Sequence, residues 1–353
     1  MNNALETLFF ALENDTEQFE NKNILFLNSM YHRCLQDSSN IHFSLFQHFR
    51  PYAQKLEDHG FEVCSSYEEV AQSSYGVCCL LLPKNMQEAR YLIAVALRSL
   101  CTGGVLFCAA DNKAGGSRLQ VLMREFGFGE VASFSRNKAR AVRVCKGNQG
   151  LVDCDVLARV VEGAIEKGGV QSVIDGRFVS RPGVYGWNKI DEGSKILAQC
   201  LPSDFSGRVA DFGCGYGYLS DVLLVHNAKI EVLHCVDADQ RALDVCALNL
   251  QKYDACEIYY HWLDLGLDLA EPRDVFDHLD CVVMNPPFHE GKKTDIQLGR
   301  AFIVRAHESL RKGGRLWMVA NAHLAYEAVL KQHFRFVDRH YEGQGFKVYE
   351  GIK

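Results

Sequence analysis

Two stretches of the sequence, 210 positions apart, are similar to each other. Residues 99–107 read SLCTGGVLF and residues 309–317 read SLRKGGRLW, and in both a helical pattern ends on paired glycines before an apolar run typical of a buried strand. Chance is the alternative, because any two α/β domains could share a glycine pair before a strand. The repeat favours a duplication, which restricts the chain to two copies of one α/β plan.

The alternation of patterns along the chain agrees with this plan. In the first half, apolar runs alternate with amphipathic stretches such as residues 86–100, whose apolar positions have helical spacing. The runs expected to form strands are residues 24–27, 61–64, 77–82, 105–109, 131–134 and 141–145. This alternation predicts doubly wound α/β domains, and 353 residues suffice for two of them, at residues 1–168 and 169–353.

A glycine-rich turn follows an apolar strand in the second half. Residues 209–219 read VADFGCGYGYL, so Gly213, Gly215 and Gly217 would let the backbone approach a ligand at the carboxyl end of the strand. About 20 residues later a second strand-like run ends in Asp237, at the spacing of an acid that accepts hydrogen bonds from ribose. Together these features predict a nucleotide site.

Details of the turn indicate which nucleotide binds. Dinucleotide sites carry Gly-x-Gly-x-x-Gly before a helix that meets a pyrophosphate, whereas the third glycine comes too early here. Asp211 would repel a pyrophosphate but could attract the ammonium group of an amino acid. A ligand with ribose, adenine and an ammonium group fits better, which points to S-adenosylmethionine. Asp264, after a third strand-like run, could accept from the adenine amino group, or it could be a helix cap or turn residue.

A stiff turn follows the apolar run of residues 279–284. It reads Asn285, Pro286, Pro287, Phe288, and the two prolines would hold the Asn side chain and nearby carbonyl groups in place. Rigid acceptors beside an aromatic face suit an amino group on a planar ring. A proline-stiffened turn without a catalytic role is the alternative.

The first half lacks both reactive features. No glycine follows the strand-like run of residues 24–27, and residues 81–84 read LLPK where the second half has the Asn-Pro-Pro-Phe turn. These losses predict that the N-terminal copy is degenerate.

The composition predicts the cellular compartment but does not identify the binding partner. No run of 18 apolar residues exists and the N-terminus is acidic, so we expect a cytoplasmic protein with no membrane segment. The 14 cysteines lie largely in apolar runs without a Cys-x-x-Cys pair, which favours buried thiols over disulfides or a metal site. The formal net charge of -6 neither indicates nor excludes a nucleic-acid partner.

Local clusters of basic and aromatic residues could contact RNA. The stretch 174–191 between the halves is rich in glycine, basic and aromatic residues, as in a lid or binding loop, although a passive linker is possible. A second cluster, at residues 136–146, could instead protect an edge strand. The candidate RNA contacts are Arg136, Lys138, Arg140, Arg143, Arg177, Arg181, Tyr185, His289, Lys292 and Lys293. His289 could also relay a proton or serve only in the turn.

The order and spacing of these motifs resemble class I methyltransferases that modify exocyclic amines. Residues 182–185, 189–194, 285–289, 319–322 and 346–349 are similar to the bacterial ribosomal RNA small subunit methyltransferase C family. The resemblance implies two tandem Rossmann-like class I methyltransferase domains, the N-terminal one degenerate and serving RNA binding or structure. It also implies S-adenosylmethionine as cofactor and N2-methylation of a guanosine in 16S rRNA, with the small ribosomal subunit as partner; we expect a monomer.

N2-methylation of guanine suits the Asn-Pro-Pro-Phe turn. Guanine N2 is a poor nucleophile, and the Asn285 oxygen with the Pro286 carbonyl would accept its two N–H bonds while Phe288 stacks on the base. The target base would have to leave its stack to reach such a site. Three alternatives remain open: a guanine-N2 methyltransferase of 23S rRNA, a protein glutamine methyltransferase, and a non-catalytic RNA-binding assembly factor with the same fold.

Overall fold

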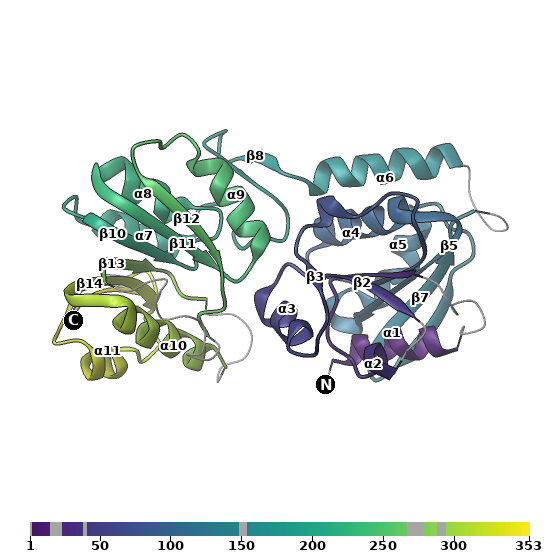
Figure 1. Cartoon of the computed structure of the whole chain (residues 1–353), viewed down its shortest axis with the longest axis horizontal. Coiled ribbons are helices and arrows are strands. Elements are labelled where there is room, and N and C mark those ends of the chain that lie inside the picture. Colours follow the sequence, from purple (N-terminus) through teal and green to yellow (C-terminus); the bar gives the residue numbers. More distant parts are fainter. Residues whose placement is uncertain (1, 15–22, 38–40, 148–153, 267–277, 288–293) are drawn as a thin grey trace. The chain divides into compact units, whose positions relative to one another are not determined.

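The structure is a computed structural model, and it describes residues 2–14, 23–37, 41–147, 154–266, 278–287 and 294–353 (Figure 1). The chain divides into two compact units. The first comprises Met1–Gln171 with Arg181–Gly183, and the second comprises Ser172–Ser180 with Val184–Lys353.

Each unit contains a seven-stranded sheet, and the two sheets have the same strand order. In the first unit the order is β3 (Val63–Cys64), β2 (His42–Phe46), β1 (Asn23–Leu27), β4 (Tyr75–Leu81), β5 (Leu100–Asp111), β7 (Ala139–Cys145) and β6 (Ala132–Arg136). In the second unit it is β12 (Glu257–Trp262), β11 (Lys229–Asp237), β10 (Ser206–Phe212), β13 (Leu279–Met284), β14 (Leu310–Asn321), β16 (Phe346–Ile352) and β15 (Phe336–Gly343). In both sheets the first five strands pair in parallel, and the sixth strand pairs antiparallel with both the fifth and the seventh.

Helices cover both faces of each sheet. In the first unit they are α1 (Asn3–Glu13), α2 (Cys34–Asp37), α3 (Arg50–Glu57), α4 (Met86–Ser99), α5 (Leu119–Glu125) and α6 (Cys154–Gly168), with short 3-10 turns at Tyr67–Glu69, Asn112–Ala114 and Gly116–Arg118. In the second unit they are α7 (Glu192–Cys200), α8 (Tyr218–His226), α9 (Gln240–Leu250), α10 (Thr294–Ser309) and α11 (Glu327–His333). Burial on both faces explains why the central strands read as continuous apolar runs rather than alternating ones.

The predicted α/β class is confirmed, and the predicted strands lie within or overlap observed ones. Strand β2 was not predicted, because its sequence HFSLF mixes His and Ser with apolar residues. The glycine pairs lie inside β5 and β14 rather than at the helix ends, since α4 ends at Ser99 and α10 at Ser309. Gly103 and Gly313 have positive φ angles of 81° and 78°, which a bulge near the start of each strand requires.

Hydrogen bonds at these bulges repeat between the units. Gly103 N donates to Lys146 O, and Gly313 N donates to Lys353 O. The ammonium groups of Lys146 and Lys353 donate to Leu100 O at 2.5 Å and Leu310 O at 2.6 Å, just beyond α4 and α10. A shared strand order and a shared lysine at matching places support the duplication inferred from the sequence.

Part of the stretch predicted to be a loop, residues 174–191, belongs to a small hairpin. Strands β8 (Gln171–Val173) and β9 (Phe178–Ser180) pair with each other, and left-handed residues at Ile174, Asp175 and Gly176 form the turn. Phe178 is buried in a cluster with side chains of the glycine-rich turn and of α9. The hairpin is therefore a packed element of the second unit.

Candidate active site

Three strand ends bring the sequence motifs of the second unit together. Val236 of β11, Phe212 of β10 and Met284 of β13 are in register across the sheet. The residues that follow them are Asp237, Gly213 and Asn285, so all three lie at the carboxyl edge of the sheet. The strand order reverses between β10 and β13, and open α/β sheets bind ligands at such a point.

The glycine-rich turn has the backbone geometry that the sequence predicts. Gly213, Gly215 and Gly217 have φ angles of 79°, 55° and 91°, a region that other residues rarely adopt. A Cβ at position 217 would lie 2.8 Å from the sulfur of Cys246, whereas a Cβ at position 215 would meet nothing within 4 Å. The turn is therefore closely packed at Gly217 and open at Gly215, where a ligand can approach the backbone.

Asp237 holds this turn in place. One carboxylate oxygen accepts from Gly215 N at 2.9 Å and the other from Asp239 N at 2.9 Å. Burial and the neighbouring charge of Asp239 raise the pKa of Asp237 to about 6, although the backbone hydrogen bonds oppose the shift. Each oxygen keeps a second lone pair, so a contact with ribose remains compatible with this arrangement.

Asp211 lies beneath the turn and is fully buried. Its Oδ2 accepts from Ser220 Oγ at 2.7 Å, and burial raises its pKa to about 8. Within the described part of the chain its Oδ1 has no partner. Asp211 does not line the pocket beside the glycines, and its predicted contact with an ammonium group stays a prediction. The Asp264 carboxylate accepts from Gly266 N at 2.8 Å, as a turn residue does, and its predicted contact with adenine also stays a prediction.

Asn285 is fixed by two side chains of the segment that begins α7. Its Nδ2 donates to Asp191 Oδ2 at 2.7 Å and to Ser194 Oγ at 2.8 Å. Its Oδ1 is buried, and no group of the described residues donates to it. Pro286 is buried and Pro287 exposed, while Phe288 lies outside the described residues. The amide thus presents one unused acceptor beside the glycine-rich turn.

A small pocket joins the two features. Its lining includes Tyr185, Asp191, Ser194, Gly213 and Asn285, together with Gly186, Lys189, Cys214, Gly215, Tyr216, Tyr218 and Leu219. The Tyr185 hydroxyl donates to Asp191 Oδ1 at 3.2 Å, and burial with this carboxylate raises the pKa of Tyr185 to about 12. Tyr185, predicted as an RNA contact, therefore lies at the candidate active site itself.

The basic residues predicted to contact RNA lie in different places. Arg136, Lys138, Arg140 and Arg143 belong to the β6–β7 hairpin at the sheet edge of the first unit, where Arg136 and Lys138 are exposed. Register places Arg140 and Arg143 on opposite faces of the sheet, so the four cations do not form one surface. His289, Lys292 and Lys293 lie outside the described residues.

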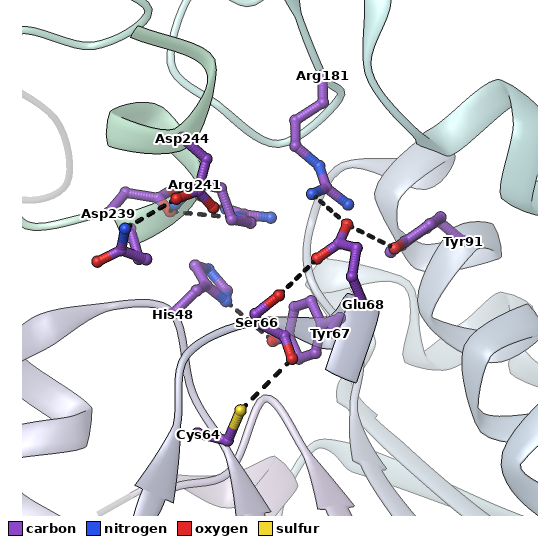
Figure 2. A network of polar contacts seen from close by, with 11 residues as sticks. His48, Cys64, Ser66, Tyr67, Glu68, Tyr91, Arg181, Asp239, Arg241 and Asp244 are labelled. Atoms are coloured by element: carbon purple, nitrogen blue, oxygen red, sulfur yellow. Dashed lines mark hydrogen bonds and ion pairs between the residues drawn. The ribbon is translucent and has the colours of Figure 1, made fainter. Parts of the chain in front are cut away.

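Arg177 and Arg181 have protein partners. Arg177 donates to the buried Asp221 at 2.8 Å, and half of its side chain is exposed. Arg181 is only 3% exposed and donates to Glu68 at 2.8 Å, with Tyr91 below its guanidinium group (Figure 2). The RNA contact predicted for Arg181 has no support in this geometry, because the ion pair buries the charge that a phosphate would need.

Sequence reasoning missed three residues that shape the site. Asp191 and Ser194 lie in the stretch 189–194, which the resemblance included without giving it a role. Asn249 of α9 accepts from Val179 N at 2.7 Å and donates to Val179 O and Tyr216 O, both at 2.8 Å. It connects the β8–β9 hairpin to the glycine-rich turn, and no sequence motif signals it.

The corresponding strand ends of the first unit carry side chains instead of glycines. The Asn28 amide nitrogen donates to Leu81 O at 2.9 Å, and that of the fully buried Gln47 donates to Ser29 O at 2.6 Å. Polar side chains thus bond the ends of β1, β2 and β4 to one another, in the place where the second unit has an open turn.

The described residues contain no grouping of three His, Cys, Asp or Glu side chains that could hold a metal ion. None of their helices combines the length and the apolar character that crossing a membrane requires.

Comparisons with known proteins agree on one type of enzyme. The methyltransferase small domain model matches residues 175–350, and the model of its N-terminal domain matches residues 11–134. Proteins named ribosomal RNA small subunit methyltransferase C from Shewanella loihica and Psychromonas ingrahamii are each 28% identical to the chain and cover 96% of it, over 96% and 94% of their own lengths. The T. thermophilus 16S rRNA N2 methyltransferase, solved with AdoMet and guanosine, superposes with a TM-score of 0.74 at 23% identity, covering 94% of this chain and 88% of that one.

Proposed function

Since the chain belongs to the ribosomal RNA small subunit methyltransferase C family, we propose that it transfers a methyl group from S-adenosylmethionine to N2 of a guanosine in 16S rRNA. The observation that carries the proposal is the unused Oδ1 acceptor of Asn285, which lies beside an open glycine-rich turn. The relatives compared above are named for the small subunit, which favours 16S over 23S rRNA.

The residues around the turn fit the cofactor. The bound cofactor would supply an electrophilic methyl group on a sulfonium. Gly213 and Gly215 leave room at the backbone, and Asp237 keeps free lone pairs for ribose hydroxyls. Asp264 is proposed to accept from adenine. Asp211, which accepts from Ser220 of α8, is proposed to favour the ammonium group.

Asn285 orients the amine. Its Oδ1 and the carbonyl oxygen of Pro286 would each accept one N–H bond of guanine N2, so that the nitrogen lone pair can point at the methyl carbon. Phe288 is proposed to stack on the base. No strong base is needed first, because the proton can leave after transfer. Positioning of this kind can supply roughly 7 to 11 kcal/mol of rate enhancement.

The first unit is proposed to bind or support the RNA rather than to catalyse. Polar side chains close the strand ends where a cofactor would lie, whereas Arg136 and Lys138 are exposed on the β6–β7 hairpin. Arg140, Arg143 and Arg177, together with His289, Lys292 and Lys293, remain proposed contacts. We propose a monomer that acts in the cytoplasm, and sedimentation of the pure protein tests its oligomeric state.

One experiment tests the reaction. The protein is incubated with cofactor labelled in the methyl group and with either assembled small subunits or naked 16S rRNA, and the RNA is digested to nucleosides. Labelled N2-methylguanosine is the expected product, and the better of the two substrates shows whether the protein acts on a particle. No labelled N2-methylguanosine from either substrate would refute the proposal.

A further inference from the structure

We propose that Asp191 is a positioning residue that makes the site selective for an N–H donor, by fixing which atom of the Asn285 amide faces the substrate. The inference rests on the proposed function. It adds the residue that determines whether Asn285 presents a hydrogen-bond acceptor or a donor to the substrate.

The contacts of Asn285 account for both of its N–H bonds. Asp191 Oδ2 and Ser194 Oγ accept from the same nitrogen at 2.7 and 2.8 Å. A half-turn of the amide would bring Oδ1 against the carboxylate oxygen, so two acceptors would meet without a proton between them. The carboxylate therefore keeps the Asn285 oxygen on the opposite side, where it is buried and receives no hydrogen bond from the described residues.

Asp191 is itself held by its surroundings. It is the N-cap of α7, and the same Oδ2 accepts from Ser194 N at 3.0 Å. Its Oδ1 accepts from the Tyr185 hydroxyl at 3.2 Å. A Cβ at Gly193 would lie 3.1 Å from both Asp191 Oδ2 and a ring carbon of Phe346, which shows how closely the segment packs. The acceptor is thus fixed before any substrate arrives.

A fixed acceptor makes the site selective for substrates that carry an N–H donor. A site built to accept an N–H bond rejects an analogue that lacks the donor, because the buried oxygen is then left unpaired. Guanosine and inosine differ in the amino group at C2, which only guanosine has. Without Asp191 the Asn285 amide can turn, and the preference for guanosine should disappear.

Equilibrium binding of these two nucleosides, at saturating S-adenosylhomocysteine, tests the inference. The wild-type protein should prefer guanosine by about tenfold, the equivalent of one net hydrogen bond of about 1.4 kcal/mol. Asp191→Ala should reduce the ratio to about one. Asp191→Asn should keep most of it, since its amide oxygen can still accept from Asn285 and from Ser194 N.

Controls separate positioning from stability. Asp191→Ser keeps an oxygen that can cap α7 but withdraws the carboxylate from Asn285, so it should lose the preference while staying folded. In the same variant, the single-turnover methylation rate should fall at least about tenfold while cofactor affinity changes less than about twofold. Asn85→Ala removes the side-chain cap of α4 in the first unit and should leave the ratio unchanged.

The outcomes distinguish two kinds of failure. If the folded Asp191→Ser or Asp191→Ala variant still prefers guanosine as the wild type does, the role of Asp191 is wrong while the proposed function stands. If the wild type does not distinguish the two nucleosides, the binding mode in the proposed function is wrong.

Discussion

At the scale of the residue, neighbouring groups decide what each polar side chain of the site can do. The Asn285 side chain has an unused acceptor oxygen because its amide nitrogen donates its hydrogen bonds to a carboxylate and a hydroxyl. Asp237 is bound to two backbone N–H groups, whereas Asp211 is buried with a single hydroxyl donor. These two carboxylates, 26 positions apart, therefore differ in their hydrogen-bond donors and in role.

Replacing Asp237 should weaken cofactor binding. Asp237→Ala removes the acceptor of Gly215 N and of Asp239 N, and hydrogen bonds to charged groups contribute about 1.5–3 kcal/mol each. Cofactor affinity measured by calorimetry should fall at least about tenfold. Asp254→Ala, at an exposed position of the same unit, is the matched control. An unchanged affinity would show that Asp237 does not organise the turn.

The buried Asp211 should make stability depend on pH. Its pKa of about 8 in the folded protein exceeds the ordinary value of 3.8, so the folded state binds the proton more tightly and ionisation destabilises it. Asp211→Asn, which cannot ionise, should gain stability over the wild type as pH rises from about 4 to about 8, by at most about 1.4 kcal/mol per pH unit. Urea unfolding of both proteins across this range measures the difference, and a difference independent of pH would contradict it.

At the scale of the element, the side chain of Asn249 hydrogen-bonds the β8–β9 hairpin to the glycine-rich turn. Asn249 bonds to the backbone of Val179 and of Tyr216, and Phe178 fills the cluster below. The sequence indicated that this stretch was more than a linker, from its aromatic residues. It could not indicate the attachment, because an Asn within a helix carries no motif and its partners lie 70 and 33 positions away.

Removing this side chain should loosen the hairpin. Asn249→Ala leaves buried backbone groups without partners, which costs about 1–3 kcal/mol of stability. Limited proteolysis should then cut the hairpin faster, and thermal unfolding should begin earlier. Gln251→Ala, at the exposed end of α9, serves as the control. Proteolysis at the wild-type rate would mean that hydrophobic packing alone holds the hairpin.

At the scale of the whole molecule, the chain contains two copies of one fold, of which one has an open carboxyl edge. The sequence predicted three features because each has its own local pattern: the repeated glycines, the apolar strands and the Asn-Pro-Pro-Phe turn. The Asp191–Asn285 contact was not, since its partners are 94 positions apart and meet only when the strand ends align. The burial of Arg181 was equally hidden, because it depends on Glu68.

The exposed cations of the first unit should contribute to RNA affinity. Reversing Arg136 and Lys138 together to Glu should weaken binding of small-subunit RNA and reduce its salt dependence, because a protein that neutralises fewer phosphates releases fewer counterions on binding. Cofactor affinity should not change. A filter-binding series at several salt concentrations measures both properties, with Lys312→Glu in the second unit as the charge control. Equal RNA affinity in all variants would exclude the hairpin from the interface.

Asn285→Ala removes the oxygen proposed to orient the amine that receives the methyl group, and a single-turnover assay measures the consequence. With small subunits or 16S rRNA in excess and labelled cofactor bound, we predict a loss of transfer of about a hundredfold or more. Cofactor affinity, measured on the same preparation, should stay close to that of the wild type. A variant that binds cofactor and still forms N2-methylguanosine at the wild-type rate would show that Asn285 does not orient the amine.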